Sequence, residues 1–272
     1  MSEHRVIVIT GAARGLGRTL AQAFLDDGCS VAVGDRDWSG EDAQIFRREL
    51  GASGRALALE LDITSQAQID DAFERIVSRF GRIDVLINNA GMRQRDLFPL
   101  IDAPKIVDTE VDQWRRMFEV NLFGTLQVIK RFAGPMIKQH RGSIINISSS
   151  STDPQNQRPD IRQQPYVASK AALNSLTTYL ASDLRASNVA VNAVLPPYML
   201  TTGVREQVLD QRASLAQPVP NPLRPEVLVP VVRFLAAQRA DGGVSGRVIV
   251  ATEWNLLHGH GTPRSWEAEV EE

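Results

Sequence analysis

The chain has 272 residues, of which 43% are hydrophobic and 23% are charged, and its formal net charge is −2. This composition is typical of a globular protein with a substantial core, and the near-neutral charge excludes the basic surface that nucleic acids or anionic membranes require. No apolar run approaches the ~20 residues needed to span a bilayer. The N-terminal segment enters a predicted strand at once and lacks the apolar stretch of a signal peptide, so we expect a cytoplasmic protein. The single cysteine, Cys29, has no thiol partner for a disulfide or a metal site, so we expect it to be a small buried residue and expect no bound metal.

Short β-branched runs alternate with longer amphipathic segments along most of the chain. The runs predict seven strands, at residues 6–10, 31–35, 56–62, 84–89, 143–148, 189–195 and 247–252. Most of them are almost continuously apolar, as in a parallel sheet that is buried on both faces. The segments between them predict six helices, at residues 16–27, 41–50, 65–80, 111–132, 167–187 and 225–237. Repeated strand–helix units predict an α/β fold, a single doubly wound parallel sheet with helices on both faces.

Domain organisation follows from the same pattern. We find no linker, repeat or low-complexity segment, so residues 1–254 are predicted to form one domain, followed by a tail at 255–272 that is either disordered or docked on another subunit. Three long connections, at 92–110, 151–165 and 198–224, follow the carboxyl ends of predicted strands. Open α/β sheets bind ligands at that edge, and long loops there are commonly functional.

The first predicted strand runs into a glycine-rich turn, TGAARGLG, that opens a helix. Glycines in such a turn let the backbone bend tightly and approach a pyrophosphate at the helix N-terminus. The spacing G-x-x-x-G-x-G differs from the dinucleotide fingerprint G-x-G-x-x-G. The turn predicts a dinucleotide site that includes Gly11, Arg14, Gly15, Leu16 and Gly17.

Asp35 ends the second predicted strand, about twenty residues past the glycine turn. Its carboxylate would accept hydrogen bonds from the ribose hydroxyls and repel a 2′-phosphate, which favours NAD over NADP. Arg14 and Arg36 leave NADP open, because either guanidinium can reach a 2′-phosphate. Arg36 can equally stack on adenine or face solvent.

The ends of the third and fourth strands predict further walls of the cofactor site. Asp62, followed by Ile63, can accept a hydrogen bond from the adenine amino group. After Asn89, the small residues Ala90 and Gly91 let a cofactor lie against the backbone. Alone these are ordinary strand-end turns, and their register with the glycine turn makes them cofactor residues.

Tyr166 and Lys170 place a phenol and an ammonium one turn apart on one helix face. A free phenol has a pKa of about 10 and carries protons poorly at neutral pH. A fixed cation beside it favours the phenolate and would make Tyr166 a usable general acid/base. The bare Y-x-x-x-K spacing is also common in surface contacts, so its function depends on the motifs upstream.

These motifs together resemble the short-chain dehydrogenase/reductase family. The matching elements are TGAARGLG (10–17), Asp35, Asp62, NNAG (88–91), Asn121, SIINISS (143–149) and YVASK (166–170), in family order. The resemblance implies a single Rossmann-type domain with a seven-stranded parallel sheet that assembles into a homotetramer or homodimer. It also implies NAD(P)-dependent interconversion of an alcohol and a carbonyl.

The resemblance also implies roles for four residues. Tyr166 would be the general acid/base for the substrate oxygen, and Lys170 would lower the pKa of Tyr166 and hydrogen-bond the nicotinamide ribose. Ser149 would hold and polarise the carbonyl, although Ser148 or Ser150 remain alternatives. Asn121 would fix a water that links Lys170 to solvent, or would be a structural residue within a helix.

The chain departs from the family pattern in the two insertions at 92–110 and 151–165 and at two strand ends. After the sixth strand, Pro196-Pro197 replaces Pro-Gly, and with Met199 and Thr201 it belongs to the expected nicotinamide side of the site. Pro197 has no amide hydrogen and fixes φ, so this loop is expected to be reshaped. The last strand ends in ATEWN (251–255) instead of Asp-Gly-Gly, and Trp254 is expected at a subunit interface or in the substrate wall.

Four arginines in the insertions offer a hypothesis about substrate. One of Arg93, Arg95, Arg158 and Arg162 would clamp a substrate carboxylate or phosphate. The alternative is solvated loop charge, because aspartates in the same loops balance the count.

The sequence therefore favours an NAD-dependent oxidoreductase acting on a small-molecule alcohol or ketone. The alternatives are an NADP-dependent carbonyl reductase of the 3-oxoacyl type and a dinucleotide-binding regulator without turnover. The intact set of Tyr166, Lys170, Ser149 and Asn121 argues against a pure regulator. Epimerisation or dehydration at the same site calls for other groups around the tyrosine.

Overall fold

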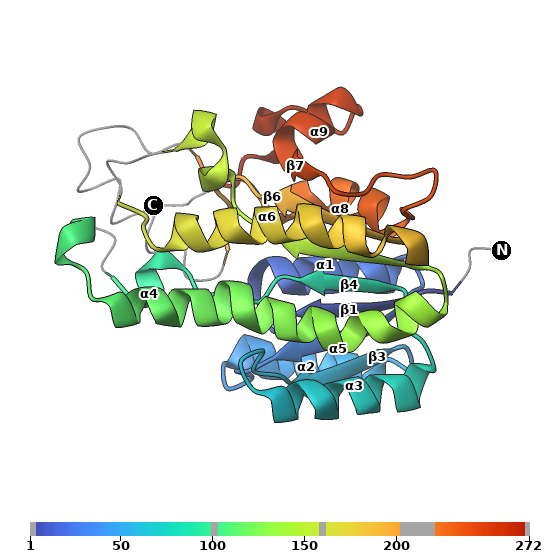
Figure 1. Cartoon of the computed structure of the whole chain (residues 1–272). Coiled ribbons are helices and arrows are strands. Elements are labelled where there is room, and N and C mark those ends of the chain that lie inside the picture. Colours follow the sequence, from blue (N-terminus) through green and yellow to red (C-terminus); the bar gives the residue numbers. More distant parts are fainter. Residues whose placement is uncertain (1–3, 99–102, 158–161, 202–220, 270–272) are drawn as a thin grey trace.

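The computed structural model describes residues 4–98, 103–157, 162–201 and 221–269. Its centre is a seven-stranded sheet with the strand order β3-β2-β1-β4-β5-β6-β7, in which all neighbouring pairs are parallel (Figure 1). The strands are β1 Val6–Thr10, β2 Ser30–Asp35, β3 Ala56–Glu60, β4 Val85–Asn88, β5 Gly142–Ile147, β6 Val189–Leu195 and β7 Val248–Val250. Chain order reverses beside β1, since β2 pairs on one side of it and β4 on the other. Such a reversal is the switch point at which open α/β sheets commonly bind ligands.

Apolar runs form these strands because both faces of the sheet are covered. Within β1, Ile7 and Ile9 belong to one buried cluster and Val8 to the other, as side chains alternate across a strand. Strands β1, β4, β5 and β6 are buried along their whole length. The predicted doubly wound sheet is confirmed.

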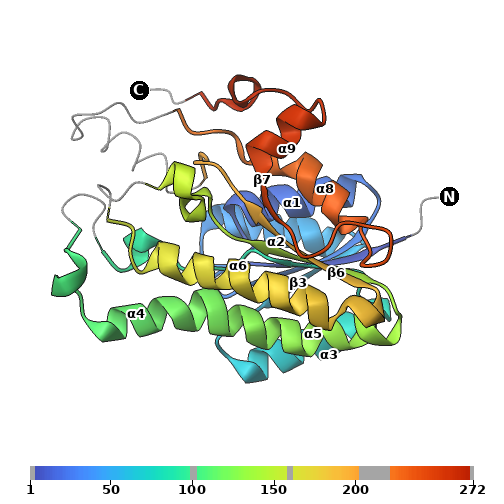
Figure 2. The same ribbon diagram turned by 45° about the horizontal axis from the view of Figure 1, so that its top comes forward.

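Helices cover both faces of the sheet (Figures 1 and 2). One cluster contains buried side chains of α1, α2 and α8, and the other contains those of α3, α5 and α6. The helices are α1 Gly15–Asp26, α2 Glu41–Ala52, α3 Gln66–Phe80, α4 Val111–Phe118, α5 Thr125–Lys138, α6 Tyr166–Asp183, α8 Val229–Ala236 and α9 Ala251–Leu257. None of the helices in the described ranges has both the length and the apolarity needed to cross a bilayer.

The helix predicted at 111–132 is longer and is interrupted. It runs from Val111 to Lys138, with a π-helical segment at Glu119–Gly124 between α4 and α5. A side chain at Gly124 would come within 3.0 Å of Ile63, so the helix lies very close to the segment that follows β3. The segment contains Asn121, and π-turns inside helices are frequently found at functional sites.

The strand predicted at 247–252 is shorter, and the prediction is wrong for its last residues. β7 ends at Val250, and Ala251 begins α9 with its side chain fully buried. Asn255, also buried, donates a hydrogen bond from Nδ2 to the carbonyl of Val227, which anchors this helix on the domain.

The described part of the tail packs on its own chain. Trp254 stacks on His258 at 4.1 Å between ring centroids and packs on Phe234 at 5.1 Å. Further along, Glu267 forms an antiparallel bridge with Leu223, which in turn pairs with Met199. The tail thus lies over the connection that follows β6.

Candidate functional site

The glycine turn between β1 and α1 is packed against the end of β4. Gly11 has φ +64°, and a Cβ there would lie 2.6 Å from the Cα of Ala90, so only glycine fits. A Cβ on Gly17 would lie 2.5 Å from the carbonyl oxygen of Gly11. The N-cap residue Arg14 makes no side-chain capping bond, and the first turn of α1 has no acidic side chain. The amides of this turn therefore suit an anionic group such as a pyrophosphate.

Asp35 lies at the end of β2, against the glycine turn. Its Oδ2 accepts a hydrogen bond from the amide of Ala13 at 2.9 Å, and its Oδ1 accepts one from the amide of Asp37 at 3.1 Å. Arg36 is exposed, and the exposed Arg14 lies 3.9 Å from Asp37 in an ion pair. The Asp35 carboxylate is thus fixed beside the glycine turn, and the guanidinium of Arg14 points toward Asp37.

The end of β4 is tied to the same turn. Asn89 donates from Nδ2 to the carbonyls of Thr10 and Gly11, at 3.0 and 2.6 Å. The hydroxyl of Thr10 accepts hydrogen bonds from the amides of Asn89 and Ala90. These bonds bring two of the predicted cofactor segments together.

Asp62 and Ile63 follow β3, which ends two residues earlier than predicted. The Oδ1 of Asp62 accepts hydrogen bonds from the amide and hydroxyl of Thr64, and Ile63 is buried against the π-helical segment. Gly91, after β4, is exposed. Leu16 is buried in the core, with 7% of its surface exposed, so its side chain supports the turn from behind.

The predicted catalytic residues converge at the carboxyl ends of β4 and β5. Ser149 follows β5, and Tyr166 is the first residue of α6. The ammonium of Lys170 is buried and donates to the carbonyl of Ile147 at 2.8 Å. A Cβ on Gly91 would lie 3.3 Å from this Nζ, so the loop after β4 also borders it.

Among the serines, the structure distinguishes two positions. The hydroxyl of Ser148 donates to the carbonyl of Lys170, which directs it at the backbone of α6. The hydroxyl of Ser149 instead lies close enough to the phenol of Tyr166 to lower the pKa of that phenol, and it accepts the amide of Ser151 at 3.2 Å. Ser149 is thus the serine beside the tyrosine.

The pKa values of the pair are set mainly by burial. Burial raises the pKa of Tyr166 above its ordinary value, while the hydrogen bond of Ser149 and the charge of Arg93 lower it. Burial lowers the pKa of Lys170 from 10.5 to about 8. The sequence did not identify this effect of the Arg93 charge on the Tyr166 pKa. That Lys170 lowers the Tyr166 pKa in the cofactor-bound enzyme stays a prediction.

Asn121 is fully buried within the π-helical segment. Its Oδ1 accepts the amide of Met92 at 2.7 Å, and its Nδ2 donates to the carbonyl of Met92 and to the hydroxyl of Ser169. The side chain therefore joins the loop after β4 to α6. Its predicted role in holding a water stays a prediction.

The loop after β6 faces the glycine turn. Pro196 is buried, and its carbonyl accepts the amide of Ser150 at 3.2 Å. A Cβ on Gly15 would lie 3.5 Å from Thr201, and Met199 bridges to Leu223. The rest of the predicted connection at 198–224 lies outside the described residues from 202 to 220.

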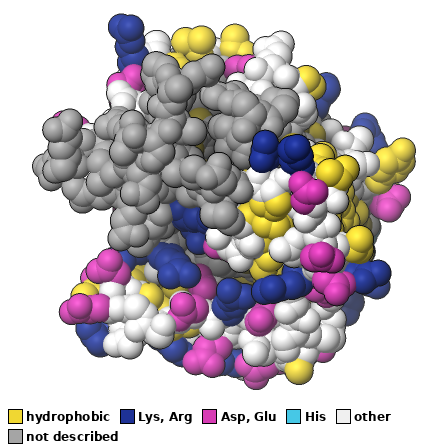
Figure 3. Space-filling model, turned by 90° about the vertical axis from the view of Figure 1, so that its left-hand side faces the viewer, with side chains coloured by type: hydrophobic (Ala, Val, Ile, Leu, Met, Phe, Trp, Pro, Cys, Tyr) yellow, Lys and Arg dark blue, Asp and Glu magenta, His cyan; other side chains and the backbone are white. Residues whose placement is uncertain are grey.

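The insertion arginines are engaged with neighbouring chain. Arg93 pairs with Asp96 at 3.1 Å, and Arg162 donates to the carbonyl of Ala103 at 2.8 Å. Burial lowers the pKa of Arg95, and the neighbouring charge of Arg93 adds to this effect. Arg158 lies outside the described residues. On the described surface of this edge, basic and acidic side chains are interspersed (Figure 3), so the substrate clamp stays a hypothesis.

Gln94 joins the two insertions and was not singled out from the sequence. It is 7% exposed, and its Nε2 donates to the carbonyls of Arg162 and Gln164. A polar residue in a charged loop carries no pattern that would have identified it.

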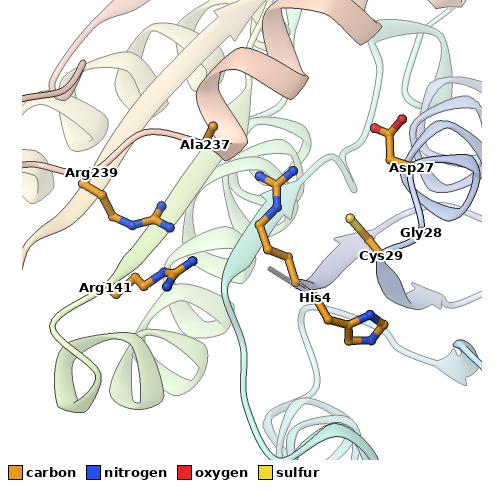
Figure 4. A pocket seen from close by; sticks show the side chains of 8 residues that line it. His4, Asp27, Gly28, Cys29, Arg141, Ala237 and Arg239 are labelled. Carbon is orange, nitrogen blue, oxygen red and sulfur yellow. The ribbon is translucent and has the colours of Figure 1, made fainter. Parts of the chain in front are cut away.

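A separate cavity lies at the opposite, amino-terminal edge of the sheet. It measures about 350 Å³, and Arg141 and Arg239 point into it across from Asp27 and Cys29 (Figure 4). Burial raises the pKa of the Cys29 thiol. None of the predicted site residues lines this cavity, so we place the functional site at the carboxyl edge, where the motifs converge.

Comparisons with known proteins agree with this geometry. Residues 5–213 match the family model described as short chain dehydrogenase. Fluoren-9-ol dehydrogenase of Terrabacter sp. (strain DBF63) is 40% identical over 97% of this chain and 75% of its own length. The 3-oxoacyl-(acyl-carrier-protein) reductase FabG of Thermotoga maritima is 32% identical over 91% of this chain and 96% of its own.

Solved structures show the same fold. A short-chain type dehydrogenase/reductase from Mycobacterium marinum superposes with a TM-score of 0.75 at 29% identity, covering 90% of this chain and 93% of its own. The site geometry, the family model and these relatives lead to one conclusion: the chain belongs to the short-chain dehydrogenase/reductase family of oxidoreductases.

Proposed function

We propose that the chain is an NAD-dependent dehydrogenase that interconverts a secondary alcohol and a ketone by hydride transfer. The observation that carries the proposal is the convergence of Ser149, Tyr166 and Lys170 beside the glycine turn, at the edge where Asp35 ends β2. The glycine turn, Asp35 and the Asn89–Gly91 segment would hold the dinucleotide. When bound, NAD supplies the nicotinamide ring that accepts or returns the hydride.

The side chains of the site handle the substrate oxygen and its proton. Ser149 holds the oxygen with its hydroxyl, in the manner of an oxyanion donor. Tyr166 removes the hydroxyl proton during alcohol oxidation and returns it during ketone reduction. Lys170, with a pKa of about 8, gains or loses a proton near neutral pH and so suits a relay from Tyr166 to solvent.

The cofactor preference is supported by Asp35. Its carboxylate is fixed by the amides of Ala13 and Asp37, and a 2′-phosphate placed there would meet a like charge. Arg14 pairs with Asp37, whereas the exposed Arg36 can still reach a 2′-phosphate, so the preference rests on the fixed charge of Asp35. NAD is therefore favoured over NADP.

The substrate class follows from the 40% identical relative that acts on fluoren-9-ol. We propose a cyclic, aromatic secondary alcohol as the substrate. Purified protein would be incubated with fluoren-9-ol and either NAD⁺ or NADP⁺ while the absorbance of the reduced nicotinamide is followed. Turnover with NAD⁺ that is lost in Tyr166→Phe supports the proposal, and turnover only with NADP⁺ contradicts the cofactor assignment.

A second candidate is an NADP-dependent 3-oxoacyl reductase. It is favoured by the 32% identical relative from Thermotoga maritima and by the presence of Arg14 and Arg36 in the cofactor site. The same assay with a 3-oxoacyl thioester and NADPH separates the two activities. Tight NAD binding without turnover of any alcohol or ketone would instead favour a regulatory dinucleotide-binding protein.

We also propose a cytoplasmic homo-oligomer, a tetramer or dimer. Large apolar side chains lie exposed on the helices that flank the sheet, namely Val111 on α4, Phe123 in the π-helical segment and Tyr179 on α6. Contact between copies through these helices would remove this surface from water. Light scattering coupled to size-exclusion chromatography tests the assembly, and a monomer at micromolar concentration would contradict it.

A further inference from the structure

Gln94 is unusual among its neighbours because it is buried. It lies in the short 3-10 helix Gln94–Asp96 after β4, where Arg93 and Asp96 are exposed and Gln94 itself is 7% exposed. Its Nε2 donates to the carbonyl of Arg162 at 3.1 Å and to that of Gln164 at 2.9 Å. Its Oε1 is buried with no hydrogen-bond partner among the described residues. A buried amide whose oxygen has no hydrogen-bond partner destabilises the folded state, so stability does not explain why glutamine occupies this position.

The carbonyls that Gln94 holds lie directly before the catalytic helix. Gln164 precedes Pro165 and Tyr166, and the amides of Val167 and Ser169 close the first turn on Gln163 and Pro165, each at 3.0 Å. Gln94 therefore holds the segment that enters α6, and the position of that segment sets the position of the Tyr166 side chain.

The loop that carries Gln94 is fixed at its other end by Asn121, which binds both the amide and the carbonyl of Met92. A further tie joins the two insertions, since Arg162 donates to the carbonyl of Ala103. Arg93 lies between these anchors and next to Gln94, in an ion pair with Asp96. Its charge is felt by the phenol of Tyr166.

We propose that Gln94 is a positioning residue: its side-chain amide ties the loop after β4 to the segment entering α6 and so sets the place of Arg93 relative to the Tyr166 phenol. The inference rests on the proposed function, because it concerns the proton carrier of that reaction. Within the described part of the chain, the charged and titratable groups near the phenol are Arg93 with its partner Asp96 and Lys170 on α6. Arg95, next along the chain, interacts electrostatically with Arg93, Asp96 and Tyr198.

The test compares Gln94→Met with a matched control, Gln139→Met. Gln139 also donates from Nε2 to two backbone carbonyls, those of Ile83 at 2.9 Å and Arg141 at 3.4 Å, and all three residues flank the amino-terminal edge of the sheet. Both substitutions remove two hydrogen bonds of the same kind. Only the first removes bonds to the segment that leads into Tyr166.

Two measurements are made on each full-length variant. Hydrogen exchange followed by mass spectrometry, without substrate, reports opening at residues 92–98 and 163–169. The pH profile of kcat/KM, with the alcohol that the wild type oxidises, reports the protonation of the general base. We expect Gln94→Met to exchange faster in both segments, to lose about tenfold in kcat through misplacement of the tyrosine, and to shift the basic pKa of its profile upward. The KM of Gln94→Met for NAD should match that of the wild type. Gln139→Met should match the wild type in every one of these measurements.

Two results would overturn the inference. One is a Gln94→Met enzyme with the wild-type pH profile and kcat, whatever its stability. The other is a Gln94→Met protein whose hydrogen exchange at residues 163–169 equals that of the wild type. This measurement can be made even on an inactive protein. If the wild type oxidises no alcohol, the proposed function fails, and the exchange comparison still decides whether Gln94 ties the two segments.

Discussion

We predict that the buried charge of Lys170 destabilises the folded state, although the residue serves catalysis. Its side chain is 5% exposed, and burial lowers its pKa from 10.5 to about 8. At about 1.4 kcal/mol per pKa unit, the charged form destabilises the folded state by about 3 kcal/mol near pH 7. The hydrogen bond that Lys170 donates to the carbonyl of Ile147 offsets about 1 kcal/mol of this destabilisation.

Lys170→Met is the substitution that tests this. Methionine has a similar length and no charge, so we expect a net gain of about 2 kcal/mol in the free energy of unfolding and a Tm higher by about 4 °C at neutral pH. Activity should fall by at least about 100-fold, since the proton relay is lost. Lys138→Met, at an exposed position in the last turn of α5, is the control and should leave both quantities unchanged.

The pH dependence gives a second check on the same group. The folded pKa of Lys170 lies below the unfolded pKa, so between about pH 8 and 10.5 the unfolded chain binds more protons and the stability of the wild type rises with pH. Lys170→Met should lack this rise. Urea unfolding at several pH values measures it, and a Lys170→Met protein that is no more stable than the wild type near pH 7, or that keeps the same rise, would refute the reasoning.

Three further substitutions test other parts of the site. Asp35→Ser removes the charge that opposes a 2′-phosphate, so the ratio of kcat/KM with NADP⁺ to that with NAD⁺ should rise by about 10- to 100-fold in steady-state assays, and an unchanged ratio would contradict the cofactor assignment. Ser149→Ala removes a donor to the substrate oxygen and should lower kcat by about 100-fold with little change in the Kd for NAD, whereas Ser148→Ala should retain more of the activity. Gly11→Ala places a methyl group 2.6 Å from the Cα of Ala90 at a positive φ, and calorimetry should show weakened NAD binding together with a loss of about 1–3 kcal/mol in stability; wild-type affinity would show that the turn tolerates a side chain.

The strands and the cofactor turn could be predicted from sequence because their patterns are local. Continuous apolar runs identified all seven strands, and the glycine spacing located the turn that Gly11 makes against Ala90. The π-helical segment was missed because the helical pattern of the sequence continues through it. The close approach of Gly124 to Ile63 is a contact between distant parts of the chain, which the sequence pattern does not show. The helix at Ala251 was missed because ATEWN continues an apolar strand, and its helical form depends on burial of Ala251 and Asn255 by distant chain.

The site was predictable where the family pattern applies and not where the insertions meet. Tyr166, Ser149, Lys170 and Asn121 lie near one another, as the family resemblance implied. The nearness of Arg93 to the phenol depends on how two insertions fold against each other, and no pattern in either insertion encodes that contact.

The central claim, that Tyr166 carries the proton in alcohol oxidation, is tested most directly by Tyr166→Phe. This change keeps the ring and removes only the hydroxyl, so cofactor binding should persist. Steady-state oxidation of fluoren-9-ol with NAD⁺, measured across a range of pH, should show kcat/KM reduced by about 100- to 10,000-fold. A Tyr166→Phe enzyme that oxidises the same alcohol at the wild-type rate would contradict the claim.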